Sequence, residues 1–359
     1  MNRNSNGEKE PEELSVSSCR ADRSEPVQLE DVACPLGCPR SDEIVLTGRD
    51  RLHDLPGEFT VLKCRTCELM RTNPRPTAAS IGAYYPDDYG PYLGTRVEQP
   101  QLTPFHGLKS FVRPLVRKVF DSLSDVLPPI PRGRLLEIGC ASGSYLDRMA
   151  HCGWQVEGIE FSEEAARAAR DLGYQVHTGS LEFAPAPNYP PDLIVGWMVL
   201  EHLHDPIGCL EKLHEWAAPG GWLVLTLPDA NTLAFEFYKE NWYDLHLPNH
   251  LYHFTPETLA KVLEKAGWTL EKVHHQRSIG NLLASTAYVM EGRGWTSLAK
   301  CFLEFSGRGG IWFYILFPFA WVLGVCGQSG RMTVWCRRSQ DEAPPSVHQH
   351  PSAVTAKKA

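Results

Sequence analysis

An acidic residue followed by a turn of small side chains is the pattern in this chain that best fits ligand chemistry. Glu137 ends an apolar run, and residues 139–143 form a small-residue turn before a helical pattern begins at Ser144. A strand that ends in such a turn and enters a helix brings backbone N–H groups close to a bound ligand. Residues 135–146 therefore predict a nucleotide-type cofactor site at the carboxyl end of a parallel strand. The alternative is a tight turn that binds nothing.

A second carboxylate follows at the spacing expected of a group that binds ribose hydroxyls. Glu160 ends the short segment 155–160, about 20 positions after Glu137. A carboxylate suits a vicinal diol because it accepts two hydrogen bonds at once. The alternative is an ordinary acid at the start of the helix that Ser162 caps, since negative charge stabilises that end.

Strand and helix patterns alternate between residues 133 and 228. Apolar segments with helical patterns after them recur about five times there, and residues 330–338 read as a last strand. Such repeats predict a parallel sheet buried on both faces. Its carboxyl edge would carry Glu137, Glu160 and Glu201.

Three segments resemble one enzyme family. The turn reads E-x-G-x-A-x-G and resembles motif I of the class I S-adenosylmethionine-dependent methyltransferases, commonly E/D-x-G-x-G-x-G. Residues 201–206, E-H-L-H-D-P, resemble the motif after the fourth strand, and residues 248–254 resemble the P-x-H-L-x-H-F signature of one subfamily. The resemblance implies a doubly wound, mostly parallel, seven-stranded Rossmann-like sheet and S-adenosylmethionine as cofactor.

The resemblance also implies residue roles. Glu137 would meet the methionine end of the cofactor, and the glycines would let the backbone approach its ribose. Ala141 is one methyl group larger than the glycine of the commonest pattern. Ser180 and Leu181 would border the adenine. The implied cofactor-binding set is Glu137, Gly139, Cys140, Ala141, Gly143, Glu160, Phe161, Ser180, Leu181 and Glu201.

Histidines in two loops are candidates for taking a proton from the methyl acceptor. Methyl transfer needs an in-line nucleophile and often a base, and the pKa of histidine lies near neutrality. His202 follows the fourth predicted strand, whereas His250 and His253 lie in the signature loop, which in the family helps to close the active site. We favour His250 as general base, with His202 and His253 as alternatives. Packed histidines without a catalytic role are the competing interpretation.

Four cysteines form two pairs ahead of this region. Cys34 and Cys38 are the first pair, and Cys64 and Cys67 are the second. Paired thiolates at this spacing suit a tetrahedral structural zinc ion. The segment resembles the zinc-ribbon-like module that precedes some bacterial methyltransferases, although its first knuckle is one residue wider than the usual C-P-x-C-G. Reduced cysteines without metal are the alternative.

Composition and charge restrict the partners and the compartment. The net charge of −8 gives no support for nucleic acid binding. The polar N-terminus lacks the apolar region of a secretory signal, so we expect a cytoplasmic protein. The expected domains are disordered tails at 1–30 and 339–359, a zinc-ribbon-like module at 31–95, a linking or lid helix at 96–130, an S-adenosylmethionine-binding domain at 131–275, and an apolar helical segment with the last strand at 276–338.

The uncharged stretch 311–326 leaves three interpretations open. It is shorter than the roughly 20 residues of a bilayer-spanning helix, and Pro318 divides it. It can pack on its own domain or on a second copy, touch a membrane surface, or span a membrane. The oligomeric state is left open.

The patterns together predict an enzyme that transfers a methyl group from S-adenosylmethionine to a small molecule. The acceptor atom would be oxygen, or carbon, of a sugar, a lipid-linked intermediate or a phenolic metabolite. One rival is a catalytically degenerate methyltransferase fold that serves as a binding scaffold, which Ala141 would permit. A second rival is an NAD-dependent oxidoreductase or epimerase, and the missing G-x-x-G continuation speaks against it.

Overall fold

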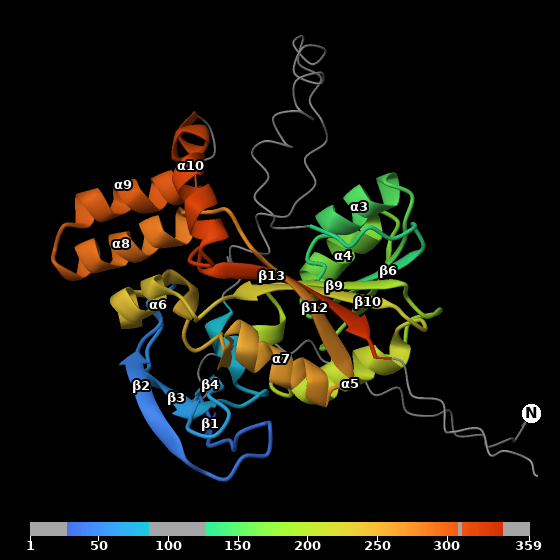
Figure 1. Cartoon of the computed structure of the whole chain (residues 1–359), viewed down its shortest axis with the longest axis horizontal. Coiled ribbons are helices and arrows are strands. Elements are labelled where there is room, and N and C mark those ends of the chain that lie inside the picture. Colours follow the sequence, from blue (N-terminus) through green and yellow to red (C-terminus); the bar gives the residue numbers. More distant parts are fainter. Residues whose placement is uncertain (1–26, 86–125, 308–310, 340–359) are drawn as a thin grey trace, which may run out of the picture.

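The computed structural model describes residues 27–85, 126–307 and 311–339 (Figure 1). The linking helix expected at 96–130 falls mostly outside these ranges, and its described part, 126–130, contains no helix. Most of both expected tails also lies outside. Leu29 and Glu30, at the end of the first expected tail, form strand β1.

A seven-stranded sheet forms the centre of the fold (Figure 1). The strand order is β12-β13-β10-β9-β6-β7-β8, and all pairings are parallel except those of β13 with β10 and β12. This arrangement confirms the doubly wound, mostly parallel, Rossmann-like sheet. Its strands are β6 (Arg134–Ile138), β7 (Gln155–Glu160), β8 (Gln175–Thr178), β9 (Leu193–Trp197), β10 (Trp222–Pro228), β12 (Trp268–His275) and β13 (Arg331–Arg338).

Helices cover both faces of the sheet because successive strand residues point to opposite sides. Leu135 packs in one core cluster with Leu146, whereas Leu136 packs in another with Leu210. The first cluster lies under α3 and α4 and the second under α5 and α7 (Figure 1). The expected alternation fails once, since the described residues 179–192 between β8 and β9 contain no helix. The helices are α3 (Ser144–His151), α4 (Glu163–Asp171), α5 (Pro206–Trp216) and α7 (Pro256–Lys265).

Side-chain caps set where the helices after the strands begin. The Ser162 hydroxyl accepts the N–H of Ala165 at the start of α4, as the sequence predicts. Thr255 and Thr258 form a reciprocal capping box at the start of α7. These caps bring the chain out of each strand end and into a helix at a defined residue.

The N-terminal module is joined to the rest of the molecule through a shared sheet. Its strands β2, β3 and β4 continue into β11, which belongs to the signature loop and pairs antiparallel with β4. The module therefore positions this loop directly. Its elements are β1 (Leu29–Glu30), β2 (Asp42–Gly48), β3 (Phe59–Cys64), β4 (Met70–Thr72), β5 (Arg75–Pro76) and η1 (Ile81–Tyr84), and the loop strand is β11 (Tyr252–His253).

Helices between the last strands form a separate lobe (Figure 1). Phe317 and Ala320 of α10 are buried, whereas Phe319, Trp321 and Val325 are 46–62% exposed. No helix among the described residues is long and apolar enough to cross a membrane. The remaining helical elements are η2 (Leu200–His202), α6 (Leu233–Tyr238), η3 (Lys239–Asn241), η4 (Tyr243–Leu245), α8 (Gly280–Gly292), α9 (Thr296–Gly307) and α10 (Ile311–Val325).

Candidate active site and metal centre

The turn between β6 and α3 can only be built with small residues. Gly139 and Gly143 have φ of +70° and +82°, and a Cβ at Gly139 would lie 2.7 Å from a methyl group of Val199. Ala141 also has a positive φ, +45°, which costs an alanine more than a glycine. The turn thus keeps its backbone tight against the strand end, and Ala141 is its strained position.

Glu137 is a buried carboxylate in the middle of the sheet. Its side chain is 2% exposed, and among the described residues Oε2 has no hydrogen-bond partner. Burial raises the pKa of Glu137 well above its usual value. A cationic group bound beside this carboxylate would satisfy Oε2 and stabilise its charged form. This chemistry fits the methionine end of S-adenosylmethionine, which carries an ammonium and a sulfonium.

Glu160 is buried too, but the neighbouring backbone holds its carboxylate. Oε2 accepts the N–H of Ala141 and Oε1 accepts the N–H of Ser162, each at 2.8 Å. Burial raises the pKa of Glu160 although these hydrogen bonds oppose the shift. Each oxygen keeps a second lone pair, so a diol can still donate two hydrogen bonds. Glu160 therefore fits the ribose role and links the first and second strand ends.

The other residues of the implied cofactor set have different surroundings. Cys140 is buried in the core cluster with Leu146, and its sulfur occupies the space that a Cβ at Gly158 would need. Phe161 is 54% exposed, whereas Leu181 is 3% exposed. Ser180 and Leu181 follow β8, at the carboxyl edge that Glu160 also reaches.

Glu201 lies with histidines. One ligand atom from each of Glu201, His202 and His250 lies within 4.8 Å of the other two. Glu201 is fully buried, and both of its carboxylate oxygens lack a hydrogen-bond partner among the described residues. Burial raises the pKa of Glu201 to about 8. His202 belongs to η2 and His250 to the signature loop, so the fold brings these two predicted histidines together.

Hydrogen bonds to backbone carbonyls assign the ring protons of two histidines. Nδ1 of His202 lies 3.0 Å from the carbonyl oxygen of Asn249, and Nδ1 of His250 lies 2.8 Å from that of Asp244. A carbonyl can only accept, so we assign the proton of both rings to Nδ1. The Tyr85 hydroxyl, 2.8 Å from Nδ1 of His202, then accepts from the same N–H. Burial lowers the pKa of His202 to about 3 and that of His250 well below its usual value. Both rings are therefore neutral, with the proton on Nδ1 and a lone pair on Nε2.

His253 is held in a different way. The Thr72 hydroxyl donates to the carbonyl of His250 at 2.8 Å and lies 3.2 Å from Nε2 of His253. Because the hydroxyl proton is already used, His253 donates to Thr72 from Nε2. His253 thereby ties strand β11 to β4 of the N-terminal module.

Several residues that the sequence analysis did not select hold this cluster together. Asp244 is buried; Arg331 donates to its Oδ1 at 2.7 Å, and Asn281 donates to its Oδ2. His246 Nδ1 lies 3.3 Å from Nε2 of His250. The Tyr85 hydroxyl lies 2.8 Å from Nδ1 of His202. Asp244 and His246 lie just before the signature segment 248–254, but no local pattern marks Arg331 or Asn281.

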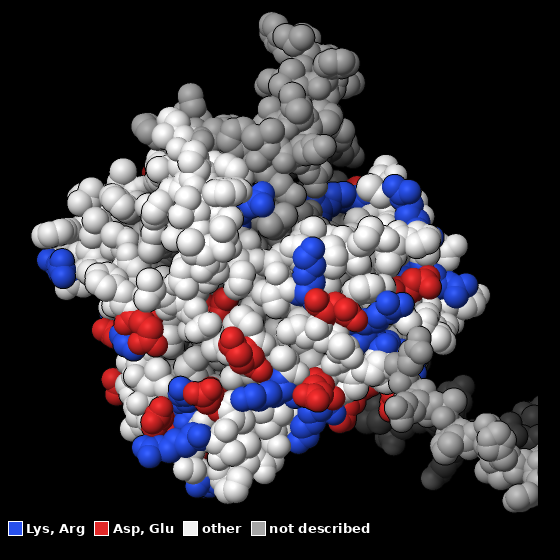
Figure 2. All heavy atoms as spheres, viewed as in Figure 1, with Lys and Arg blue, Asp and Glu red and all other residues white. Residues whose placement is uncertain are grey.

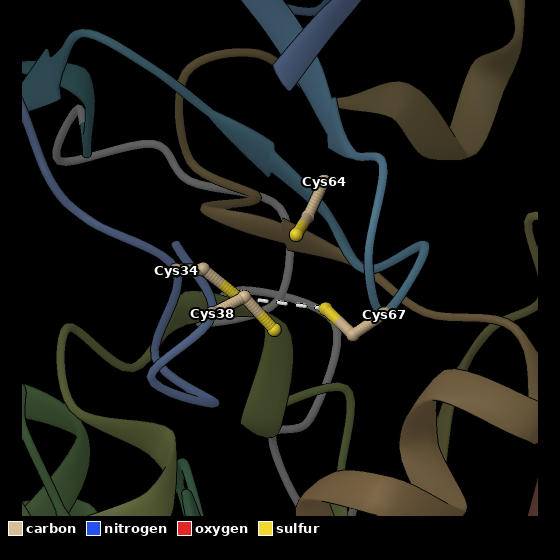
Figure 3. A group of neighbouring side chains, drawn as sticks. All are labelled: Cys34, Cys38, Cys64 and Cys67. Atoms are coloured by element: carbon tan, nitrogen blue, oxygen red, sulfur yellow. Dashed lines mark hydrogen bonds between the residues drawn. The ribbon is translucent and has the colours of Figure 1, made fainter. Parts of the chain in front are cut away.

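The four predicted cysteines form the cluster that Figure 3 shows, with their sulfurs facing one another. All four Sγ atoms lie within 4.8 Å of one another, and those of Cys34 and Cys67 are 3.4 Å apart. Burial raises the pKa of the Cys64 thiol, but backbone N–H groups of Cys67 and Thr66 outweigh it and bring the pKa to about 7. The wider first knuckle does not prevent convergence, and the donor set fits a tetrahedral zinc ion.

Comparison with known proteins agrees with this geometry. Residues 108–273 match a family described as a methyltransferase domain. The match covers slightly less than half of the chain, and this segment is similar to that methyltransferase family.

Individual relatives are more distant. The chain is 24% identical to a ubiquinone biosynthesis O-methyltransferase of Nitrosospira multiformis, over 39% of this chain and 64% of that protein. It is 32% identical to one of Aromatoleum aromaticum, over 29% of this chain and 47% of that protein. Both alignments span less than two thirds of the relative. The structure of magnesium protoporphyrin IX methyltransferase from Synechocystis, with bound S-adenosylhomocysteine, matches with 15% identity and a TM-score of 0.40, covering 69% of this chain and 93% of that one.

Proposed function

We propose that the protein transfers a methyl group from S-adenosylmethionine to a hydroxyl oxygen of a small phenolic or lipid-linked acceptor. The observation that carries the proposal is the pair of buried carboxylates, Glu137 and Glu160, on either side of the glycine turn. Oε2 of Glu137 lacks a hydrogen-bond partner among the described residues, and each oxygen of Glu160 keeps a lone pair beside its hydrogen bond to the backbone. A cation and a diol, the two groups that the cofactor offers, would complete these contacts. The names of the O-methyltransferase relatives support oxygen as the acceptor atom.

In this proposal the residues of the turn bind and orient the cofactor. Glu137 receives the cationic methionine end, Glu160 receives the ribose hydroxyls, and Gly139, Ala141 and Gly143 keep the backbone close. Cys140, Phe161, Ser180 and Leu181 complete the surroundings of the base and ribose. When bound, S-adenosylmethionine supplies the electrophilic methyl group. The protein then has to hold the acceptor oxygen in line with it and remove the proton.

We place the acceptor hydroxyl against the cluster of Glu201, His202 and His250. In the Rossmann-like sheet the ends of β6 and β9 are adjacent, so residues after β9 adjoin the cofactor turn. His202 and His250 each present a lone pair on Nε2, whereas His253 uses its Nε2 proton to hold Thr72. We therefore assign acceptor activation to the cluster and a structural role to His253.

Calorimetric titration with S-adenosylhomocysteine tests the proposal. The Glu160→Ala variant loses two charge-assisted hydrogen bonds, so its dissociation constant should rise on the order of 100-fold. Glu163→Ala is the matched control. Glu163 is the first residue of α4, the helix that follows Glu160, and its carboxylate is exposed to solvent. Thermal unfolding of each variant checks that the fold is intact. Absence of binding by the wild-type protein at millimolar ligand, or equal affinity of Glu160→Ala, would refute the proposal.

We also propose a cytoplasmic enzyme that works at a membrane surface. Ten cysteines among the described residues are unpaired, which fits a reducing compartment. On the face in Figure 2, few charged side chains lie over α8, α9 and α10, whereas both signs of charge gather over the N-terminal module. Co-sedimentation with anionic lipid vesicles should retain the wild-type protein and lose most of a Phe319→Ser/Trp321→Ser variant. Equal sedimentation of the two proteins would show that this surface packs within the chain. Dimerisation of the wild-type protein but not of the variant would show that the surface binds a second copy.

A further inference from the structure

We propose that Glu201, His202 and His250 bind a divalent first-row transition cation. Binding itself is independent of the enzymatic activity. Its role, activation of the acceptor hydroxyl, rests on the proposed function. The cation would occupy a site separate from the four cysteines, with one carboxylate and two imidazole ligands.

The first argument is proximity. One donor atom of each residue lies within 4.8 Å of the other two. Ligand atoms that share an ion at about 2.1 Å are separated by about 4 Å at most. A shift of less than about 1 Å in side chains therefore brings the three donors onto one ion. Two of the donors, Glu201 and His202, belong to the same helical turn, η2, and this turn holds them at a constant distance.

The second argument is the orientation of the two imidazole rings. Metal-binding histidines commonly donate their other ring N–H to a carbonyl, which directs the remaining lone pair to the metal. His202 donates Nδ1–H to Asn249, and His250 donates Nδ1–H to Asp244. The ring orientation thus leaves Nε2 of each histidine as the nitrogen that can bind an ion, although Nε2 of His250 first has to lose its contact with His246.

The third argument is the unsatisfied side chain of Glu201. A fully buried carboxyl group with no hydrogen-bond partner on either oxygen among the described residues is costly. Arg331 already makes two hydrogen bonds to Asp244. A divalent cation would satisfy both oxygens of Glu201.

One contact has to change when the cation binds. His246 donates Nδ1–H to Nε2 of His250 at 3.3 Å, the longest of the histidine hydrogen bonds in this cluster. The cation replaces this bond, and the His246 ring turns aside. Two histidines and one carboxylate leave coordination positions open. A hydroxyl oxygen of the acceptor can take one of them, and the cation then lowers its pKa.

Titration with Mn²⁺ followed by electron paramagnetic resonance tests the site. The protein is first loaded with one equivalent of zinc, which fills the four thiolates. Mn²⁺ prefers oxygen and nitrogen ligands, so it should then bind at the second site. The wild-type protein should bind one Mn²⁺ per chain. Glu201→Gln, which keeps the shape of the side chain, and His250→Asn should each weaken binding at least tenfold. His204→Asn is the control, because His204 bonds to the carbonyl of Pro76 outside the cluster.

The outcomes separate this inference from the proposed function. Absence of Mn²⁺ binding at millimolar concentration, or unchanged binding in both ligand variants, overturns the metal site. S-adenosylhomocysteine titration on the same samples reports the cofactor site independently. Cofactor binding without Mn²⁺ binding leaves the methyltransferase assignment standing and removes the metal. Mn²⁺ binding that depends on Glu201, without cofactor binding, leaves the metal site standing and removes the methyltransferase assignment.

Discussion

The cofactor turn and the histidine cluster each contain a buried glutamate, but the two carboxylates are held differently. Glu160 accepts two backbone N–H groups from residues within 20 positions of it. Glu201 accepts none on its side chain among the described residues and lies against two histidines. The Glu160 carboxylate already has one hydrogen bond on each oxygen and offers its remaining lone pairs to a ligand. The Glu201 carboxyl group has no hydrogen-bond partner on either oxygen among the described residues, and burial raises its pKa to about 8. Burial alone therefore does not define the role of a carboxylate; its existing partners do.

The two regions also differ in how far apart their residues lie in the sequence. The cofactor turn comes from two consecutive strands. The cluster instead combines η2, the signature loop, Arg331 of β13 and Thr72 of the N-terminal module. A change far away in sequence should therefore disturb the cluster and leave the turn intact.

The largest expected effect is loss of the aspartate that supports the cluster. Asp244→Ala leaves Arg331 partly buried without its anion and should lower the free energy of unfolding by about 3–5 kcal/mol. Urea unfolding measures the change. Glu236→Ala is the control, since its exposed pair with Lys239 should be worth about 1 kcal/mol or less. Equal effects of the two variants would show that Asp244 is not the support described here.

The next effect is a pH dependence of stability that comes from Glu201. Its pKa is about 8 in the folded protein and 4.5 as the ordinary value, so the folded state binds more protons between these values. Stability should fall as pH rises from about 4.5 to 8, by a total on the order of a few kcal/mol, and Glu201→Gln should not show this loss. Chemical unfolding at several pH values, with and without Mn²⁺, measures it. A wild-type curve parallel to that of the variant would contradict the prediction.

A smaller effect concerns cofactor affinity. Burial raises the pKa of Glu137 in the free protein, and the cationic ligand favours its ionised form. Affinity for S-adenosylhomocysteine should therefore fall as pH is lowered, and Glu137→Gln should bind about tenfold more weakly with a flat pH profile. Titrations between about pH 6 and 9 test this. A flat wild-type profile would place the ligand's charge elsewhere.

The smallest effect is expected at Ala141. Its positive φ of +45° is strained, so Ala141→Gly relieves about 1 kcal/mol. The unfolded state of the variant gains a similar amount of entropy, and net stability should change by less than about 1 kcal/mol. Ala166→Gly, inside α4, should instead destabilise by about 1 kcal/mol. A large change in cofactor affinity at Ala141 would show that its methyl group obstructs the site.

Much of the fold was predictable because the signals are local. Apolar runs ending in Glu137 and Glu160 predict strands and strand ends, and Ser162 predicts where a helix begins. The cysteine pairs predict a cluster, and the four sulfurs do converge. The alternation rule overstated the helices, since residues 179–192 cross to β9 without one. Hydrophobic periodicity identifies helices and strands. It gives no information about a connection, such as 179–192, that contains neither.

The sequence by itself determined which residues could do chemistry, whereas the tertiary structure decided how they are grouped. Spacing placed Glu201 with the cofactor carboxylates, but its side chain lies with His202 and His250. The resemblance of residues 248–254 to a family signature favoured His250, but it did not show that the Nδ1 proton of His250 is donated to Asp244. Local patterns report neighbours within a few turns or one strand–helix unit. Pairing of β11 with β4 and of β13 with β10 and β12 joins segments far apart in sequence, and only these pairings bring Thr72 and Arg331 to the cluster.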